Sequence, residues 1–111
     1  MTCSRFDVVV VPFPFSERPA QKRRPALALS RPEFNAASGA TLLAMITSAA
    51  NPPWPLDVGL HLSGTGLRAP SKVRMKLFTL DNRLIAERIG TLHVSDQTRI
   101  AMALRRMLGR F

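Results

Sequence analysis

Runs of apolar residues, separated by prolines and charged residues, divide the first half of the chain into short segments. Phe6–Phe13 holds four consecutive valines, a run typical of a strand buried on both faces. Because proline cannot donate to a strand ladder, Pro12 and Pro14 are predicted to end this strand. Two further apolar runs predict strands at Pro25–Ser30 and Ala40–Thr47.

The later segments alternate more regularly between polar and apolar residues. Leu56–Leu62, Lys72–Leu80 and Arg88–Leu92 are each predicted to be strands. In the middle one, alternation places the apolar side chains on one face and the basic side chains on the other. The connector Arg31–Gly39 has room for a helical turn, and the glycines of Ser63–Pro70 predict a turn.

The C-terminal segment predicts a helix. Ser95 is a suitable N-cap, and Asp96 favours the positive start of the helix. Apolar residues then recur at helical spacing along one face: Ile100, Leu104, Met107, Leu108 and Phe111. Several short strands and one closing helix predict a mainly β (α+β) fold, a small barrel with the helix packed at its end. The length of 111 residues fits a single domain, 1–111.

Charge gives the first indication of a partner. Lys and Arg total 16 against 7 acidic residues, for a net charge of +9. Most of these basic residues are arginines, whose planar guanidinium suits phosphate. A nucleic acid is therefore the expected partner. A basic genome composition, or docking to an acidic protein, would also explain the charge.

Two features bear on where the protein works. The longest aliphatic run, Val8–Val11, is far shorter than the roughly 20 residues of a membrane helix, and no signal peptide is expected. Cys3 is the only cysteine, so an internal disulfide is excluded. We therefore expect a cytoplasmic protein without membrane association.

Most patterns of metal and nucleophile chemistry are missing from the sequence. His61 and His93 lie far apart, and no spacing matches a zinc or calcium site, so no metal and no other cofactor is expected. Both histidines are expected to be surface or structural residues. The sequence has no Gly-x-Ser-x-Gly elbow, and the short 64–66 glycine pair predicts a turn rather than a phosphate loop.

Arginine and hydroxyl chemistry remains possible at two strand ends. Arg24 is predicted to end a loop just before strand Pro25–Ser30, and Thr47 ends strand Ala40–Thr47. If these strands are neighbours, the two side chains share a pocket in which a guanidinium can stabilise a phosphate transition state. RNA suits such a pocket because it supplies its own nucleophile, the 2′-hydroxyl. Structural roles for both residues are the simpler interpretation of these features alone.

Five segments taken together carry a family resemblance. They read FDVVVVPFPF, KRRPALALS, LLAMITSA, GLRAPSKVRMKLFTLD and RIGTL. In this order and spacing the chain resembles the PemK/MazF toxins of type II toxin-antitoxin systems, from Phe6 to the C-terminal helix. The Arg-Pro-Ala strand that follows a basic loop is the most specific of the five.

The resemblance implies an SH3-like antiparallel barrel of the CcdB/MazF kind with a C-terminal helix, assembled as a homodimer. It implies a sequence-selective endoribonuclease that cleaves single-stranded RNA, usually mRNA, without a metal. The implied products are a 2′,3′-cyclic phosphate and a 5′-hydroxyl. It also implies a cognate antitoxin whose acidic, disordered tail occupies the RNA groove at the dimer interface.

By the same resemblance, the catalytic residues are Arg24, for proton transfer and charge stabilisation, and Thr47, for contact with the phosphate. Other candidate RNA-binding residues are Lys22, Arg23, Ser48, Trp54, Ser71 and Lys72. Trp54 lies between prolines and is a candidate to stack on a base, or else an anchor in the core or a dimer. Some family members carry an acidic residue before the arginine, where this chain has Pro19 with Glu17 nearby. This departure leaves the cleavage rate and sequence preference open.

Two functions without catalysis are the alternatives. A CcdB-like gyrase poison has the same barrel and cleaves nothing, but such poisons lack the arginine–threonine pair. A small-barrel nucleic-acid-binding protein normally shows more surface aromatics than this chain, of which 6% is aromatic. Four of its phenylalanines are expected in the core: Phe6, Phe13, Phe15 and Phe78.

Overall fold

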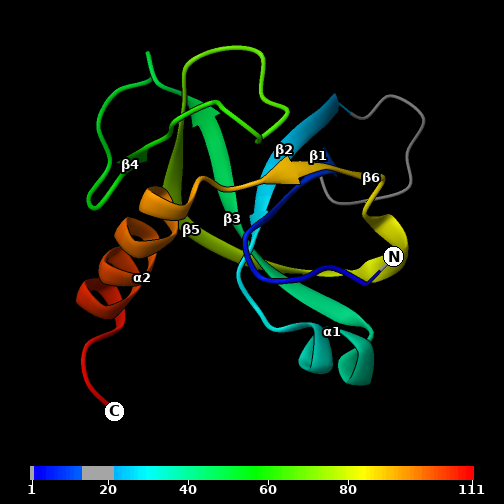
Figure 1. Cartoon of the computed structure of the whole chain (residues 1–111). Coiled ribbons are helices and arrows are strands. Elements are labelled where there is room, and N and C mark those ends of the chain that lie inside the picture. The colour runs from blue at the N-terminus through cyan, green and yellow to red at the C-terminus, as the bar shows by residue number, and fades with distance from the viewer. Residues whose placement is uncertain (1, 14–21) are drawn as a thin grey trace.

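Residues 2–13 and 22–111 are described by the computed structural model (Figure 1). The elements in chain order are β1 (Asp7–Phe13), β2 (Lys22–Ala28), α1 (Pro32–Ser38), β3 (Ala40–Ser48), β4 (Val58–Gly59), β5 (Ser71–Asp81), the 3-10 helix η1 (Asn82–Leu84), β6 (Glu87–Thr91) and α2 (Val94–Leu108). The helical turn expected in Arg31–Gly39 is α1. Pro14, Phe15, Glu17 and Pro19, which entered the sequence predictions, lie outside the described residues.

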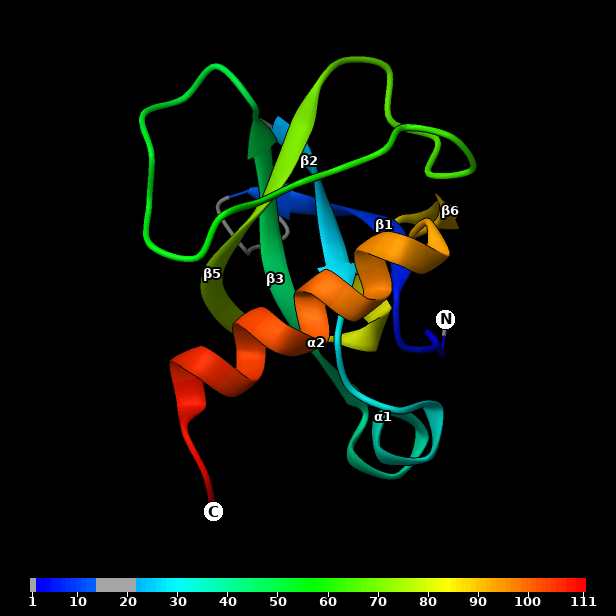
Figure 2. The same cartoon turned by 60° about the vertical axis from the view of Figure 1, so that its left-hand side comes forward.

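Within the described residues, six strands form one antiparallel sheet in the order β4-β5-β3-β2-β1-β6. The sheet curls into a half-barrel, and α2 crosses one of its faces (Figure 2). The prediction of a mainly β fold with a C-terminal helix is confirmed. No helix of the described residues combines the length and apolar character needed to cross a bilayer.

The valine run of β1 is buried on both faces, as predicted. Val8 packs between the sheet and α2, in a cluster that includes Leu27 and Ile100. Val9 packs on the opposite face, in a second cluster with Leu43. All five side chains are fully buried, so β1 holds the two layers of the core together.

The strand predicted at Phe6–Phe13 is confirmed as β1, but Pro12 does not end it, because the strand continues through Pro12 to Phe13. β6 pairs with β1 only as far as Val10, so Pro12 has a neighbour on one side alone, where proline is tolerated. Because β2 pairs with this last part of β1, β2 begins already at Lys22. Arg24 therefore lies inside β2, opposite Val11. Phe13 is 43% exposed, so its predicted place in the core is also wrong.

The strand predicted at Leu56–Leu62 is reduced to the two residues of β4, Val58–Gly59. Beyond it, the backbone of His61 donates to the Asp96 carboxylate at the start of α2, with N to Oδ2 at 2.7 Å. That bond draws the chain away from the sheet edge and towards the helix. The alternating pattern alone could not reveal it.

The helix α2 differs from its prediction at both ends. Its N-cap is His93, whose ring Nδ1 accepts from the Ser95 amide at 3.2 Å, so the prediction of Ser95 as N-cap is wrong. Ile100 is fully buried, but Leu108 is 53% exposed, and Phe111 lies beyond the helix and is fully exposed. The predicted apolar face therefore packs against the core from Ile100 through Leu104 to Met107, and its last two members, Leu108 and Phe111, are exposed.

The loop between β4 and β5 lies close against β6 because of two glycines. Gly66 has φ +75°, and a Cβ there would lie 2.3 Å from the carbonyl oxygen of Ile89. A Cβ on Gly90 would lie 2.4 Å from the carbonyl oxygen of Gly64. This close backbone packing fixes the loop that leads to Ser71 and the start of β5.

Candidate functional site

A cleft of about 570 Å³ opens where β2 begins and β3 ends. Most of its wall is apolar: Val11, Phe13, Pro25, Met45, Ile46, Ala69, Pro70 and Phe78. Its polar lining consists of Arg24, Thr47, Ser48, Asn51 and Ser71. Among the described residues that line it, Arg24 is the one charged side chain. The cleft therefore suits a ligand that combines an anionic group with flat, apolar parts.

Strand register explains why Arg24 and Thr47 meet. The β2–β3 ladder ends at the pair Ala26–Met45. Continuing that register by two residues on each strand places Arg24 opposite Thr47, and opposite residues of an antiparallel pair share a face. Because the ladder stops before this point, the strands part and the cleft opens between the two side chains.

The Arg24 guanidinium is available to a ligand. Arg24 is an exposed residue of β2, and none of the described residues forms an ion pair or hydrogen bond with its side chain. A guanidinium presents several donors in one plane, which match the oxygens of a phosphate. Arg24 is thus placed to bind an anion at the mouth of the cleft.

Thr47 is half-buried and is held by a side-chain hydrogen bond. The Asn51 amide nitrogen Nδ2 donates to Thr47 Oγ1. Asn51 belongs to the loop that follows β3, and its backbone amide donates to the Ser48 carbonyl at 3.1 Å, closing a turn. The Ser48 hydroxyl accepts from the Ala50 amide at 3.2 Å. The hydroxyls at this strand end are therefore set by the turn that follows it.

Three charged side chains hold the far part of this loop, and we term them the loop clamp: Asp57, Lys72 and Arg74. Lys72 Nζ lies 3.2 Å from Asp57 Oδ2 and donates to the Asn51 carbonyl at 2.7 Å. Arg74 Nη2 lies 3.1 Å from the same carboxylate oxygen and donates to the Pro52 carbonyl at 2.6 Å. The clamp thereby joins β5 to the proline-rich loop beside the cleft.

The charges of the loop clamp are withdrawn from solvent. Their side chains are 11% exposed for Lys72, 13% for Asp57 and 14% for Arg74. Burial by itself would raise the pKa of Asp57, but hydrogen bonds from Arg74, from the Trp54 amide and from Lys72 outweigh it and hold that pKa below its ordinary value. Asp57 is therefore ionised at neutral pH and offsets one of the two positive charges of Lys72 and Arg74.

Trp54 belongs to the proline-rich loop and is not among the residues that line the cleft. The residue is 41% exposed. Lys76 Nζ lies 4.5 Å from the ring centroid, and Arg74 Cζ lies 5.8 Å from it. Both contacts are within the range of cation–π attraction. The indole thus packs against basic side chains of β5.

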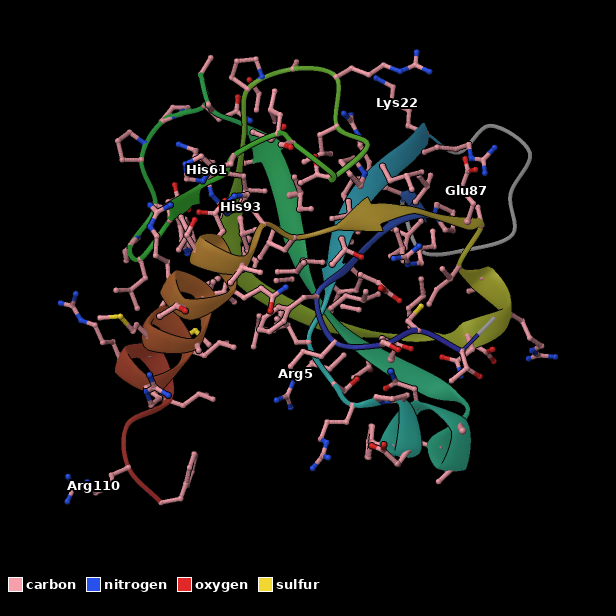
Figure 3. The ribbon with its side chains drawn as sticks, in the orientation of Figure 1. Arg5, Lys22, His61, Glu87, His93 and Arg110 are labelled. Carbon is pink, nitrogen blue, oxygen red and sulfur yellow. The ribbon has the colours of Figure 1, made fainter. Side chains whose placement is uncertain are left out.

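The structure divides the sequence-predicted site residues into two groups. Those that line the cleft are Arg24, Thr47, Ser48 and Ser71. Those that do not are Lys22, Arg23, Trp54 and Lys72. Lys22 and Arg23 are exposed on β2 near the cleft mouth, and Figure 3 shows Lys22 at the tip of that strand. Lys72 is buried behind the cleft in the loop clamp, where its ammonium contacts protein oxygens.

The sequence analysis did not single out Asn51. The one signal available was its place, a short polar side chain in the loop just after the strand-end threonine. Side chains of this kind often bond back to nearby backbone or hydroxyl groups. Asp57 and Arg74 were also missed, because their pairing links a loop and a strand that are separate in the sequence.

The two histidines form a cluster at the start of α2 (Figure 3), and neither lines the cleft. Their ring centroids lie 4.8 Å apart. His61 Nδ1 lies 3.1 Å from the carboxylate of Asp96, a fully buried residue. Burial alone would raise the pKa of Asp96, but bonds from His61 and Arg99 lower it. The cluster anchors the chain after β4 to the helix, which agrees with the structural role expected for His61.

Comparison with known proteins identifies related chains. The family model of the PemK-like, MazF-like toxin of type II toxin-antitoxin system matches residues 4–108. The crystal structure of MazE-MazF (Form-III) from Deinococcus radiodurans is similar at a TM-score of 0.80 and 21% identity, over 100% of both chains. An endoribonuclease in complex with its cognate antitoxin from Mycobacterial species is similar at a TM-score of 0.76 and 18% identity, over 97% of this chain and 94% of that one.

A third solved structure, the Mycobacterium tuberculosis toxin MazF-mt6, is similar at a TM-score of 0.73 and 22% identity, over 90% of this chain and 93% of that one. No curated protein sequence matches the chain. At these identities the solved structures establish a shared fold. The expected SH3-like, CcdB/MazF-like architecture with a C-terminal helix is thereby confirmed.

Proposed function

This chain belongs to the PemK-like, MazF-like toxin family of type II toxin-antitoxin systems, and we propose that it is an endoribonuclease that cleaves single-stranded RNA. One observation carries the proposal: Arg24 and Thr47 line the same cleft at the ends of adjacent strands. A guanidinium without a partner among the described residues and a hydroxyl, in one apolar-walled cleft, can hold a phosphodiester and the bases beside it. The net charge of +9 favours a polyanionic substrate.

In the proposed reaction the substrate supplies the nucleophile. The ribose 2′-oxygen attacks the adjacent phosphorus and loses its proton. The bond from phosphorus to the 5′-oxygen breaks, and that oxygen takes up a proton. The products are a 2′,3′-cyclic phosphate and a 5′-hydroxyl, and no metal or other cofactor takes part.

Each residue of the pair has a role in that step. The Arg24 guanidinium donates to the non-bridging oxygens, whose charge grows in the transition state, and assists the proton transfers. The Thr47 hydroxyl donates to a phosphoryl oxygen and fixes the phosphate for in-line attack. The apolar wall excludes water, which strengthens both interactions.

The proposed assembly is a homodimer that works in the cytoplasm and is neutralised by a cognate antitoxin. Two of the similar solved structures are complexes of this kind, an endoribonuclease with its cognate antitoxin and a MazE-MazF pair. An antitoxin segment rich in acidic residues would complement the basic surface and compete with RNA for the cleft.

The test is mapping of the RNA ends produced by the wild type, Arg24→Ala and a matched control, Arg106→Ala. Arg106 is an exposed arginine of α2 and does not line the cleft. Arg24→Ala is expected to lower cleavage at least about a hundredfold, since loss of one charge-stabilising donor costs about this much. Arg106→Ala is expected to cleave like the wild type.

Two additions test the chemistry. A 2′-deoxynucleotide at the cleavage position should block cutting there, and EDTA should leave the rate unchanged. Intact RNA with the wild type, or full activity of Arg24→Ala, would overturn the proposal. Intact RNA together with inhibition of gyrase would favour a CcdB-like poison.

A further inference from the structure

In the hydrogen bond between the side chains of Asn51 and Thr47, Asn51 is the donor and Thr47 the acceptor. A threonine hydroxyl holds one hydrogen and can accept as well as donate, whereas an amide NH₂ can only donate. Because Asn51 Nδ2 donates to Thr47 Oγ1, the hydroxyl hydrogen is left to another acceptor. Both residues line the cleft, so an acceptor bound there is in position to receive it.

The backbone of Asn51 is held by hydrogen bonds, although the residue is exposed. The backbone carbonyl of Asn51 accepts from Lys72 Nζ at 2.7 Å, and its backbone N–H donates to the Ser48 carbonyl at 3.1 Å. Lys72 is fixed in turn by Asp57 within the loop clamp. These bonds fix the backbone position from which the Asn51 side chain reaches Thr47, so the side chain pays less conformational entropy to hold its own bond.

We propose that Asn51 is a positioning residue that turns the Thr47 hydroxyl outward as a hydrogen-bond donor to a phosphoryl oxygen. The loop clamp keeps Asn51 in register with Thr47. This inference rests on the proposed ribonuclease function and deepens it. Thr47 thus serves as a donor to the bound phosphate, and proton transfer to and from the ribose oxygens falls to other groups.

The kinetic test is a double-mutant cycle of Asn51→Ala and Thr47→Ala, measured on one RNA with a single cleavage site. Asn51→Ala is expected to lower kcat about tenfold or more with little change in KM, because a misdirected donor acts on the transition state. In the Thr47→Ala background, Asn51→Ala should cost nothing further, because the hydroxyl that it orients is gone. Thr98→Ala, at an exposed site on α2, is the matched control.

A conservative variant sharpens the test. Asn51→Asp keeps the size of the side chain but turns a donor into an acceptor, so the Thr47 hydroxyl would point at the carboxylate instead of the substrate. Its kcat is expected to fall at least as far as that of Asn51→Ala. Its added charge would raise KM, which is read separately. Wild-type kcat in either Asn51 variant, or an equal loss with and without the Thr47 hydroxyl, would overturn the inference.

A measurement without RNA separates this inference from the proposed function. The side-chain amide of Asn51 gives an NMR signal that reports on its acceptor. Replacing the acceptor with Thr47→Val should shift that signal and speed its exchange with water. An unchanged signal would overturn the positioning role even if the wild type cleaves RNA. A shifted signal with a wild type that leaves RNA intact would support the contact and refute the ribonuclease.

Discussion

Replacement of Asp57 by asparagine should destabilise the protein strongly although Asp57 lies in a loop. The wild-type carboxylate accepts from Arg74 Nε at 3.2 Å, from Arg74 Nη2 at 3.1 Å and from the Trp54 amide at 3.0 Å, and it pairs with Lys72 Nζ at 3.2 Å. Asparagine keeps the shape and part of the hydrogen bonding. It removes the carboxylate charge, which is the one negative charge of the loop clamp and faces Lys72 and Arg74.

The unfolding free energy that Asp57→Asn should lose lies between the values for a fully buried and an exposed ion pair. Removing one partner of a fully buried pair costs about 3–5 kcal/mol, whereas exposed pairs contribute about 0–1 kcal/mol. The clamp side chains are only 11–14% exposed, so Asp57→Asn should lose about 2–4 kcal/mol of unfolding free energy. Lys72→Met should lose less, about 1 kcal/mol, because Asp57 keeps Arg74 as its partner.

The loss should depend on pH in one direction. The pKa of Asp57 is lower in the folded protein than in the unfolded chain, so its stabilisation is present above the unfolded pKa, about 4. It fades as pH falls through the folded pKa. The wild-type and Asp57→Asn stabilities should therefore differ most near pH 7 and converge in acid.

Urea denaturation followed by circular dichroism, repeated between pH 7 and pH 3, measures both effects. The Lys72→Met variant serves as the matched comparison. A loss below about 0.5 kcal/mol at pH 7, the size of an ordinary surface substitution, would refute the clamp. A difference between the two proteins that does not shrink in acid would refute the role assigned to the Asp57 charge.

Three further substitutions or treatments have definite expected outcomes. Gly66→Ala should cost about 1–3 kcal/mol in denaturation experiments, because φ of +75° and the Ile89 carbonyl leave no room for a Cβ; wild-type stability would contradict this. Cys3 is 1% exposed and burial raises its thiol pKa, so it should react with iodoacetamide only after urea is added, and rapid native labelling would disprove its burial. Asp96→Asn should lose about 1–3 kcal/mol at neutral pH and less in acid, and a pH-independent loss would show that the charge facing His61 is unimportant.

The core of the fold could be predicted because its signals are local. Four consecutive valines, the apolar run before Thr47 and the spacing around Ile100 each identify an element from neighbouring residues. The antiparallel barrel and the catalytic roles of Arg24 and Thr47 came from family resemblance, and the pattern alone predicted a shared pocket only if their two strands were neighbours. Adjacent strand ends offer no local signal of which side chains will face one another.

The features that the local pattern did not show depend on contacts with polar partners. Alternation placed Lys72 and Arg74 on one face, and both contact the same Asp57 oxygen, but the pattern could not show that Asp57 reaches over that face from a separate loop and buries the Lys72 ammonium. Ser95 was chosen as N-cap by residue type, and the ring of His93 took that place. In each case a polar partner that the local pattern does not identify determined the contact.

The pairing of β1 with β6 has a consequence for when the proposed activity can begin. Asp7 and Arg88, which form an ion pair, are 81 residues apart in the chain, so the sheet is completed only when nearly all of the polypeptide has left the ribosome. Topologies rich in such distant contacts fold slowly compared with local ones. Under the proposed function, the chain would therefore stay inactive during synthesis and for some time afterwards, and the proposed antitoxin would have that interval in which to bind it.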